Sequence, residues 1–484
     1  MSDSGSSTPT VSYKWREIAD LPLELDALRD RELESLFQVW TAQKDAIKDQ
    51  DRIREFNAEL AREWAIETGV IEGVYTLERG ITQTLIERGI DATYIPRETT
   101  NLDPDVVARI IRAHAAVLEG LFAFVKGERS LTTGYIKELH AALLRYQDTF
   151  VVFDEAGQEF RKALEKGAYK TLPNNPSRPD GRIHEYCPPE HVASEMDRLV
   201  ELHDQHAIRE VPPHIEGAWL HHAFSQIHPF QDGNGRVART LASIVFIKSG
   251  FFPLLVKRDD NAQYIEALEQ ADQGGISPVV QMFARLQKRS LTRAIGRAAD
   301  VKPVSSVEEA VAVTRDLLVD VGRIIPRQYN NAKVTAAALL HLTNSRLSGV
   351  ATSLANDVSQ VNKDYIFGVG SFGGPPTKEI NAIAAKLQYD PNTNDHHQSL
   401  VFSLSVKGAE SRIVVSFHGV GAAFRGLLVA VAYFQSGDGA AVPLSEDIFR
   451  ISYEEPRPEI DNRYKAWLDQ CIIKGLAEWR SSIV

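Results

Sequence analysis

The feature that most constrains this chain is the stretch His228 to Arg239, which reads HPFQDGNGRVAR. Apolar residues recur at helical spacing before it, from Ile215 to Ile227, and after it, from Val237 to Ile247. This periodicity predicts an amphipathic helix on each side. We therefore expect the stretch to be a loop that joins two helices, with the second helix starting near its glycines.

The polar residues of this loop suit the binding of a nucleotide phosphate. Gly233 and Gly235 permit a close approach that a side chain would block, so successive N–H groups can converge on an anion. The positive end of the following helix lies at the same place. Asp232 offers a hard oxygen ligand to Mg²⁺, and Asn234 and Arg236 can donate hydrogen bonds to phosphate oxygens.

A base accompanies the phosphate-binding groups. His228 has an ordinary pKa near neutrality, so it can accept the proton of a hydroxyl group. A histidine before proline, or an isolated Asp-Gly-Asn-Gly sequence, is also common in surface turns, and that alternative stays open for either piece alone. The whole stretch favours an anion site with a base beside it.

The stretch fits the pattern HPFx[D/E]GNGRxxR at every specified position and resembles the motif of the Fic family of nucleotidyl transferases. The resemblance covers about residues 60 to 290. It implies a mainly α fold, a Fic-type helical bundle with a β-hairpin flap. It also implies a protein adenylyltransferase, an enzyme that moves AMP from ATP to a Ser, Thr or Tyr hydroxyl of a target protein.

The resemblance assigns a role to each motif position. His228 would deprotonate the target hydroxyl, and Asp232 would hold Mg²⁺ or Mn²⁺ against the α- and β-phosphates of ATP. The phosphate-binding residues would be Gly233, Asn234, Gly235, Arg236 and Arg239, the last of these at the γ-phosphate. A relative that transfers the terminal phosphate has lysine at the position of Gly235, so Gly235 favours transfer of AMP.

A second motif lies far upstream, where Thr68, Glu72 and Gly73 fit the pattern [S/T]xxxE[G/N]. In the Fic family this pattern marks an inhibitory helix, which we expect here at about residues 62 to 78. The resemblance implies that Glu72 pairs with Arg239 and fills the space that the γ-phosphate needs. The alternative is an ordinary exposed glutamate on an amphipathic helix.

The resemblance also points to a flap that aligns the target by strand pairing. The flap residues would be Arg182, Ile183, His184, Glu185 and Tyr186. Composition alone predicts a short strand here between turn-forming clusters. Lys170 and His184 could approach the phosphates or the target, but we expect each to be an ordinary surface residue.

Asn261 and Tyr264 correspond to the region that lies near the adenine in Fic proteins. The helical spacing of Tyr264 is also that of an ordinary core residue, and this alternative stays open.

The length of 484 residues predicts more than one domain. Alternating apolar patterns late in the chain predict that its last part is α+β. The expected parts are a disordered N-terminus (1–14), a helical region that carries the inhibitory helix (15–100), a Fic catalytic domain (101–298) and an α+β domain of unknown role (306–484).

Charge and composition limit the partners and the compartment. The net charge of −11 gives no basic surface for nucleic acid or for an anionic membrane. The two cysteines, Cys187 and Cys471, exclude a disulfide framework and suit a reducing cytosol. The first residues resemble no signal peptide, so we expect a cytoplasmic protein, although secretion by a route without an apolar signal stays open.

The expected partners are ATP and a protein with an exposed hydroxyl residue. Self-modification and a homodimer stay open. The alternative functions are removal of AMP, transfer of another nucleotide on the same scaffold, or a regulatory interaction module with weak activity.

Overall fold

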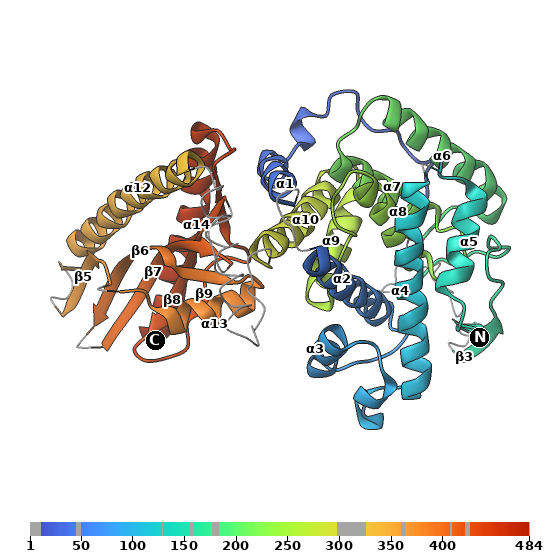
Figure 1. The fold of residues 1–484 in the computed structure, drawn as a ribbon, viewed down its shortest axis with the longest axis horizontal. Coiled ribbons are helices and arrows are strands. Elements are labelled where there is room, and N and C mark those ends of the chain that lie inside the picture. The colour runs from blue at the N-terminus through green and yellow to red at the C-terminus, as the bar shows by residue number, and fades with distance from the viewer. Residues whose placement is uncertain are drawn as a thin grey trace, which may run out of the picture. The chain divides into compact units, whose positions relative to one another are not determined.

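The structure is a computed structural model, and it describes residues 11–44, 50–127, 129–153, 158–176, 183–297, 326–359, 364–372, 374–406, 409–421 and 426–483. The chain divides into two compact units. The first comprises Met1–Asp30 and Arg54–Gln287, and the second comprises Arg31–Ile53 and Lys288–Val484. Figure 1 shows the helices and strands of each.

The first unit is mainly helical. Its helices are α2 (Gln50–Ile71), α3 (Arg79–Arg88), α4 (Pro104–Lys126), α5 (Thr133–Leu143), α6 (Val192–Ile208), α7 (Pro213–Ile227), α8 (Asn234–Lys248), α9 (Asn261–Asp272) and the first half of α10 (Ser277–Arg297). Short 3-10 helices span Asp26–Leu28, Ala92–Tyr94, Arg97–Thr99, Pro189–His191 and Arg258–Asp260. Helix α8 is buried along almost its whole length and contacts α4, α5 and α7 (Figure 1). The helices predicted on both sides of the HPFQDGNGRVAR loop are therefore confirmed as α7 and α8.

Helix α2 ends earlier than the sequence suggested. Gly73 has a φ angle of 65°, in the left-handed region that glycine adopts at low cost. Its N–H donates to the carbonyl of Val70, and the N–H of Val74 donates to the carbonyl of Gly69. This pair of hydrogen bonds is the usual glycine stop signal of a helix. The helix expected to reach residue 78 therefore ends at Ile71.

Among the residues that the structure describes, four short strands complete the first unit. Strands β2 (Thr149–Phe153) and β3 (Glu159–Ala163) form an antiparallel hairpin. Strand β1 (Val11–Tyr13) pairs in parallel with β4 (Ile183–His184), which belongs to the predicted flap. The prediction of disorder up to residue 14 is therefore wrong for Val11–Tyr13, because these residues have a strand partner far along the chain. Arg182 lies outside the described residues.

The second unit combines a sheet with helices. Its strands are β5 (Tyr365–Gly370), β6 (Pro391–Val406), β7 (Ala409–Val420), β8 (Leu427–Ser436), β9 (Val442–Pro443) and β10 (Phe449–Ser452). They run antiparallel in the order β10-β8-β7-β6-β5, with β9 beside β8. Its helices are α1 (Arg31–Lys44), the end of α10, α12 (Pro326–Ser359), α13 (Thr377–Leu387) and α14 (Arg457–Ile483).

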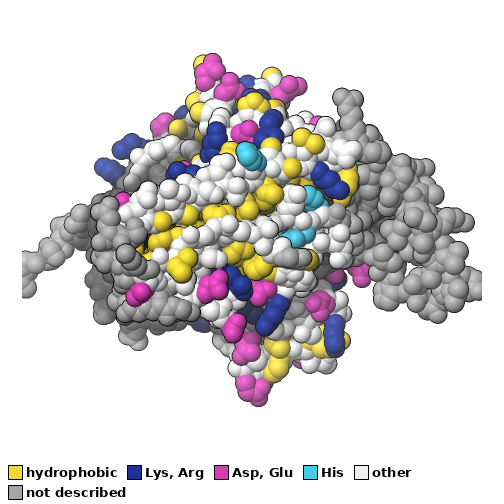
Figure 2. Space-filling view, turned by 90° about the vertical axis from the view of Figure 1, so that its left-hand side faces the viewer, with side chains coloured by type: hydrophobic (Ala, Val, Ile, Leu, Met, Phe, Trp, Pro, Cys, Tyr) yellow, Lys and Arg dark blue, Asp and Glu magenta, His cyan; other side chains and the backbone are white. Residues whose placement is uncertain are grey.

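The core of this unit lies between one face of the sheet and helices α12 and α14. Alternate residues of the central strands face it, such as Phe402 and Leu404 on β6, and they meet Leu339 and Leu468 of the two helices. On the side shown in Figure 2, a band of hydrophobic side chains crosses the middle of the face, and charged side chains gather above and below it. The predicted fold class, mainly α with an α+β C-terminal part, is confirmed.

Helix α1 belongs to the second unit, although it precedes the first unit's helices in sequence. Its Glu32 carboxylate is buried and lies 2.9 Å from Lys288 Nζ, 3.3 Å from Arg463 Nη1 and 3.6 Å from Arg450 Nη1. Burial alone would raise the pKa of Glu32, but the three cations lower it to about 2. The domain bounds expected from the sequence placed α1 in the N-terminal helical region, and they did not group it with the C-terminal part of the chain.

Candidate functional site

His228 stands at the end of α7 in a fixed orientation. It adopts a left-handed backbone conformation, and its N–H donates to the Phe224 carbonyl. Its Nδ1 lies 3.3 Å from the carbonyl of Ser225, which can only accept, so the proton sits on Nδ1 and Nε2 is the acceptor. The Tyr186 ring stacks on the imidazole at 3.7 Å. Burial, followed by the charge of Lys170, lowers the pKa of His228 to about 3, so the ring is a neutral base at pH 7.

The loop after His228 is fixed by buried side chains. The Asn234 side chain accepts from the N–H of Phe230 at 2.9 Å and donates to its carbonyl at 2.7 Å. The Phe230 ring stacks on His140, whose Nε2 donates to the Asp232 carbonyl at 3.0 Å. His140 Nδ1 accepts from the N–H of Gly167 at 2.8 Å, which sets its tautomer. The amide of Asn234 thus holds the loop, and its backbone N–H is the group at the helix start.

A carboxylate lies at the start of α8. Gly233 is the N-cap residue, with a φ angle of 80°. A Cβ atom at position 235 would collide with the carboxylate of Glu72. The N-terminus of a helix carries a partial positive charge and unpaired N–H groups, so it favours an anion at this place. In this structure the anion is Glu72.

The same carboxylate is bound to the last arginine of the loop motif. Arg239 is 1 % exposed, and its Nη1 donates to Glu72 Oε1 at 2.9 Å. Its Nη2 donates to the carbonyl of Thr68 at 3.3 Å. Burial alone would lower the pKa of Arg239, but Glu72 and Tyr264 outweigh it and raise that pKa. The two sequence motifs therefore meet at one buried ion pair.

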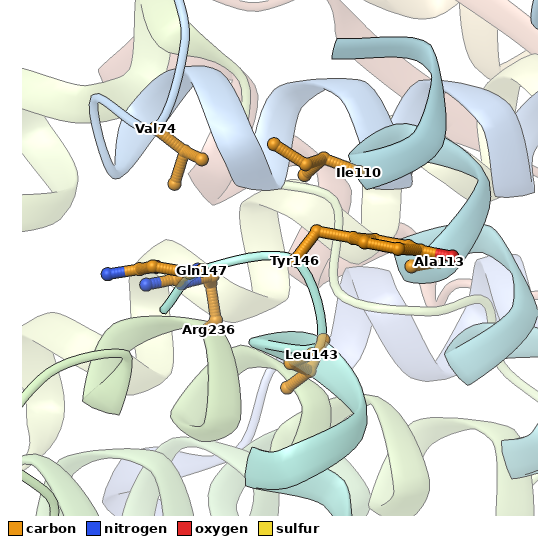
Figure 3. A pocket seen from close by; sticks show the side chains of 7 residues that line it. All are labelled: Val74, Ile110, Ala113, Leu143, Tyr146, Gln147 and Arg236. Atoms are coloured by element: carbon orange, nitrogen blue, oxygen red, sulfur yellow. The ribbon is translucent and has the colours of Figure 1, made fainter. Parts of the chain in front are cut away.

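Asp232 and Arg236 form the other side of the loop. Gln147 Nε2 donates to Asp232 Oδ2 at 2.5 Å, and Arg236 Nη2 lies 3.6 Å from Asp232 Oδ1. A small pocket lies beside Gln147 and Arg236, and Val74 and Ile110 line it as well. Figure 3 shows Gln147 and Arg236 side by side, across from these two apolar residues. The space is smaller than most ligand pockets, so a whole nucleotide would need more room than it offers.

The donor set at Asp232 suits a magnesium ion that is held mainly by a ligand. Among the residues that the structure describes, no group of three or more His, Cys, Asp or Glu side chains is placed to hold a metal. Mg²⁺ commonly binds through one carboxylate together with phosphate oxygens and water. The half-exposed Asp232 carboxylate can bind Mg²⁺ in that way. A metal site made of protein ligands alone would need further acidic or histidine side chains nearby.

The two residues expected near an adenine lie at α9. Asn261 is its first residue. Tyr264 is 3 % exposed, and its hydroxyl lies 2.7 Å from Nε2 of His221. Tyr264 also faces Arg239, so it lies behind the ion pair and in the core. An adenine contact by these residues stays a prediction.

Two residues expected at the surface are buried instead. Lys170 and His184 are each 4 % exposed, so the surface prediction is wrong for both. Lys170 Nζ donates to Asn174 Oδ1 at 2.7 Å and to the Ile227 carbonyl at 3.4 Å. Burial lowers the pKa of Lys170 to about 8. Its place beside His228 could not be read from turn-forming neighbours in the sequence.

Two residues that shape the loop, His140 and Gln147, were not predicted from the sequence. They lie at α5 and just after it, and both reach Asp232. No local motif marks either of them, and only their three-dimensional neighbours reveal the role.

No helix within the described ranges is long and apolar enough to cross a membrane.

Comparison with known proteins finds a family model that matches the part of the chain holding this site. The model of the Fic/DOC family matches residues 130–246. The protein adenylyltransferase fic-1 of Caenorhabditis elegans is 32% identical over 108 residues, which are 22% of this chain and 21% of that protein. The protein adenylyltransferase Fic of Drosophila mojavensis is 24% identical over 306 residues, which are 61% of this chain and 53% of that protein.

The matched part of the chain thus spans about a fifth of the first relative and about half of the second. Among solved structures, a Fic domain containing signaling protein from Bacteroides thetaiotaomicron is 25% identical, with a TM-score of 0.45. The alignment covers 55% of this chain and 96% of that one. The family match includes the whole loop from His228 to Arg239, so residues 130–246 of this chain are similar to the Fic/DOC family over the stretch that carries this site.

Proposed function

We propose that this protein is a protein adenylyltransferase, which moves AMP from ATP to the hydroxyl of a Ser, Thr or Tyr residue. The observation that carries the proposal is the position of His228, a neutral base held beside the anion-binding start of α8. Two relatives named protein adenylyltransferase match the chain, which supports the same reaction.

Each loop residue would have its own role in this reaction. His228 Nε2 accepts the proton of the target hydroxyl. The hydroxyl oxygen then forms a bond to the α-phosphorus, and the bond from that phosphorus to the bridging oxygen of the β-phosphate breaks. The electron pair leaves with pyrophosphate. The N–H groups of Gly233, Asn234 and Gly235 would stabilise the charge that develops on the phosphate oxygens, with Arg236 at the β-phosphate.

Asp232 would hold Mg²⁺ in this site. When bound, the metal ion neutralises phosphate charge and orients the phosphates. Gln147 keeps the carboxylate of Asp232 directed toward the loop. Mn²⁺ has a similar preference for oxygen ligands and could occupy the same position.

Glu72 would restrain the reaction. Its carboxylate occupies the start of α8 and pairs with Arg239, the residue that would contact the γ-phosphate. ATP in a productive pose and Glu72 therefore compete for one cation. The resting protein is on this proposal a slow enzyme, and displacement of Glu72 makes it faster.

The target would dock on the flap, and Asn261 and Tyr264 would lie near the adenine. The protein would act in the cytoplasm, where its two buried free thiols, Cys187 and Cys471, would stay reduced. Modification of its own chain is an outcome that the labelling below would detect. Homodimer formation is a separate property that sedimentation would measure.

The test uses ATP labelled at either the α- or the γ-phosphate, incubated with cell lysate and the wild type, Glu72→Gly or His228→Ala. We expect label from the α-position only, more of it with Glu72→Gly and none with His228→Ala. Label from the γ-position alone would overturn the assignment of the transferred group. No label with any variant would favour a regulatory interaction module or another nucleotide donor.

Removal of AMP is a second candidate on the same scaffold. The paired carboxylate of Glu72 lies beside the anion site, where it could also orient a water molecule. Release of AMP from a labelled target by the wild type, and its loss in Glu72→Gly, would favour this reaction.

A further inference from the structure

The chain's own N-terminal segment occupies one edge of the flap strand. The N–H groups of His184 and Tyr186 bond to residues 176 and 175 on one side of the strand. The N–H of Glu185, between them, points the other way and donates to the carbonyl of Tyr13 at 3.0 Å. Alternate N–H groups of a strand serve opposite edges. Strand β1 therefore pairs with the edge of the flap strand opposite residues 175 and 176, which we call the outer edge.

Tyr13 fills a defined slot at this edge. Its ring stacks on His184 with centroids 4.6 Å apart, and its hydroxyl accepts from Gln226 Nε2 at 3.0 Å. Asp272 borders the slot, and its carboxylate lies 3.0 Å from Nε2 of His222. Burial and then the charge of Asp272 raise the pKa of the Tyr13 hydroxyl. The slot therefore accepts a flat ring with a neutral hydroxyl group at its tip.

The slot lies close to the proposed base. The ring of Tyr186 stands next to His184, with centroids 4.8 Å apart, and stacks on His228 at 3.7 Å. Gln226 is also only two positions before His228. A segment bound along this edge is thus aligned beside the reacting centre.

The residues after Tyr13 are fastened to α6 and α7. Ile18 is fully buried, and its N–H donates to Glu195 at 2.8 Å. The indole of Trp219 donates to the carbonyl of Ala19 at 2.8 Å. His206 bridges Asp20 and Glu216, at 2.7 Å from each. We call residues 14–22 the strap. The strap keeps β1 close to the flap and so raises its local concentration there. Strand β1 itself has only three residues, so it makes few contacts of its own.

We propose that β1 is a tethered occupant of the edge on which a target docks, and that the target is an extended segment with a tyrosine for the Tyr13 slot. A two-strand contact this short is weak without its tether. A longer segment with the same aromatic residue can replace it. The proposal rests on the proposed function only in naming the docked segment a target, because the edge and the slot are features of the fold.

The test measures binding of a fluorescent peptide with the sequence TPTVSYKW, residues 8 to 15, to the full chain. The full-length Tyr13→Ala variant should bind it at least about tenfold more tightly than the wild type, because the tethered competitor is weakened. A peptide with alanine in place of its tyrosine should bind Tyr13→Ala several-fold more weakly, since stacking on His184 is lost. Tyr94→Ala, altered at a tyrosine outside the strap and the flap, should match the wild type.

Equal binding of the peptide by the wild type and Tyr13→Ala would overturn the proposal, and so would no binding by Tyr13→Ala. Full retention of binding by the alanine peptide would overturn the tyrosine slot. The assay contains no nucleotide, so its result does not depend on AMP transfer. Failure of AMP transfer and failure of this inference are therefore distinguishable.

Discussion

Oε1 of Glu72 lies 2.9 Å from Nη1 of Arg239, although 167 positions separate the two residues in the chain. Arg239 is buried, so loss of its carboxylate partner would leave an unpaired cation in the interior. A γ-phosphate is the other anion that can satisfy this cation on our proposal. On our proposal the same ion pair therefore does two things: it neutralises the buried Arg239, and it restrains the activity of the site.

We predict that Gln147→Ala raises the magnesium requirement. Gln147 donates to the Asp232 carboxylate, and such neighbours of a metal ligand typically contribute tenfold or more to metal affinity. The Mg²⁺ concentration for half-maximal labelling, measured in the Glu72→Gly background, should rise by about tenfold. Gln83→Ala, at an exposed position of α3, is the control. An unchanged magnesium requirement in Gln147→Ala would contradict the assigned role of Asp232.

Stability should fall in mild acid because of buried histidines. Burial lowers the pKa of His114 and of His140 to about 4, from an ordinary value of 6.5. Between these two pH values the unfolded chain binds protons that the folded chain does not. The free energy of unfolding should therefore drop by about 1 kcal/mol per pH unit for each histidine as the pH falls from 6.5 to 4.

Urea unfolding at pH 7, 5.5 and 4.5, followed by tryptophan fluorescence, measures this slope. His114→Gln should make the slope shallower, whereas His191→Gln, at an exposed position, should leave it as in the wild type. The account of the buried histidines fails if His114→Gln and the wild type lose stability in parallel.

We predict that Glu32→Gln destabilises the second unit. The carboxylate of Glu32 is shared by Lys288, Arg450 and Arg463, and its loss removes this shared acid, although Arg450 keeps Asp447 and Arg463 keeps Glu455. The cost should be about 3 kcal/mol in the free energy of unfolding. Glu34→Gln on the same helix is the matched control. Equal thermal unfolding midpoints for the two variants would show that Glu32 does not join α1 to this unit.

Acid should weaken the same cluster. The pKa of Glu32 in the folded protein is about 2, below its ordinary value of 4.5. The stabilisation is therefore complete above pH 4.5 and is lost as the pH falls toward 2. Glu32→Gln should remove this part of the acid sensitivity, and an unchanged acid profile would count against the ion cluster.

Much of the fold was predictable because the patterns are local. Helices α7 and α8 and strands β6, β7 and β8 follow from periodicity in their own residues. Helix α14 and strand β1 were not predicted. Strand β1 is three residues long, and its partner lies at Ile183–His184, so no local signal announces it.

In the site, too, residues in local motifs were predictable, whereas residues that depend on distant partners were not. The motif loop and Glu72 could be named from short patterns, and the structure places them together. Lys170 and Gln147 could not, because each acts through neighbours that are distant in sequence. The helix stop at Gly73 also corrected the extent of α2, which places Glu72 just beyond the end of that helix.

The central claim is that Glu72 restrains transfer of AMP by His228. Its most direct test is the rate of incorporation of α-labelled ATP by Glu72→Gly relative to the wild type, with Glu55→Gly, at an exposed position of α2, as control. We predict an increase of about 10-fold to 100-fold for Glu72→Gly, the usual range for one regulatory coupling. The increase should disappear in Glu72→Gly/His228→Ala. Equal rates for Glu72→Gly and the wild type, or label that persists without His228, would contradict the claim.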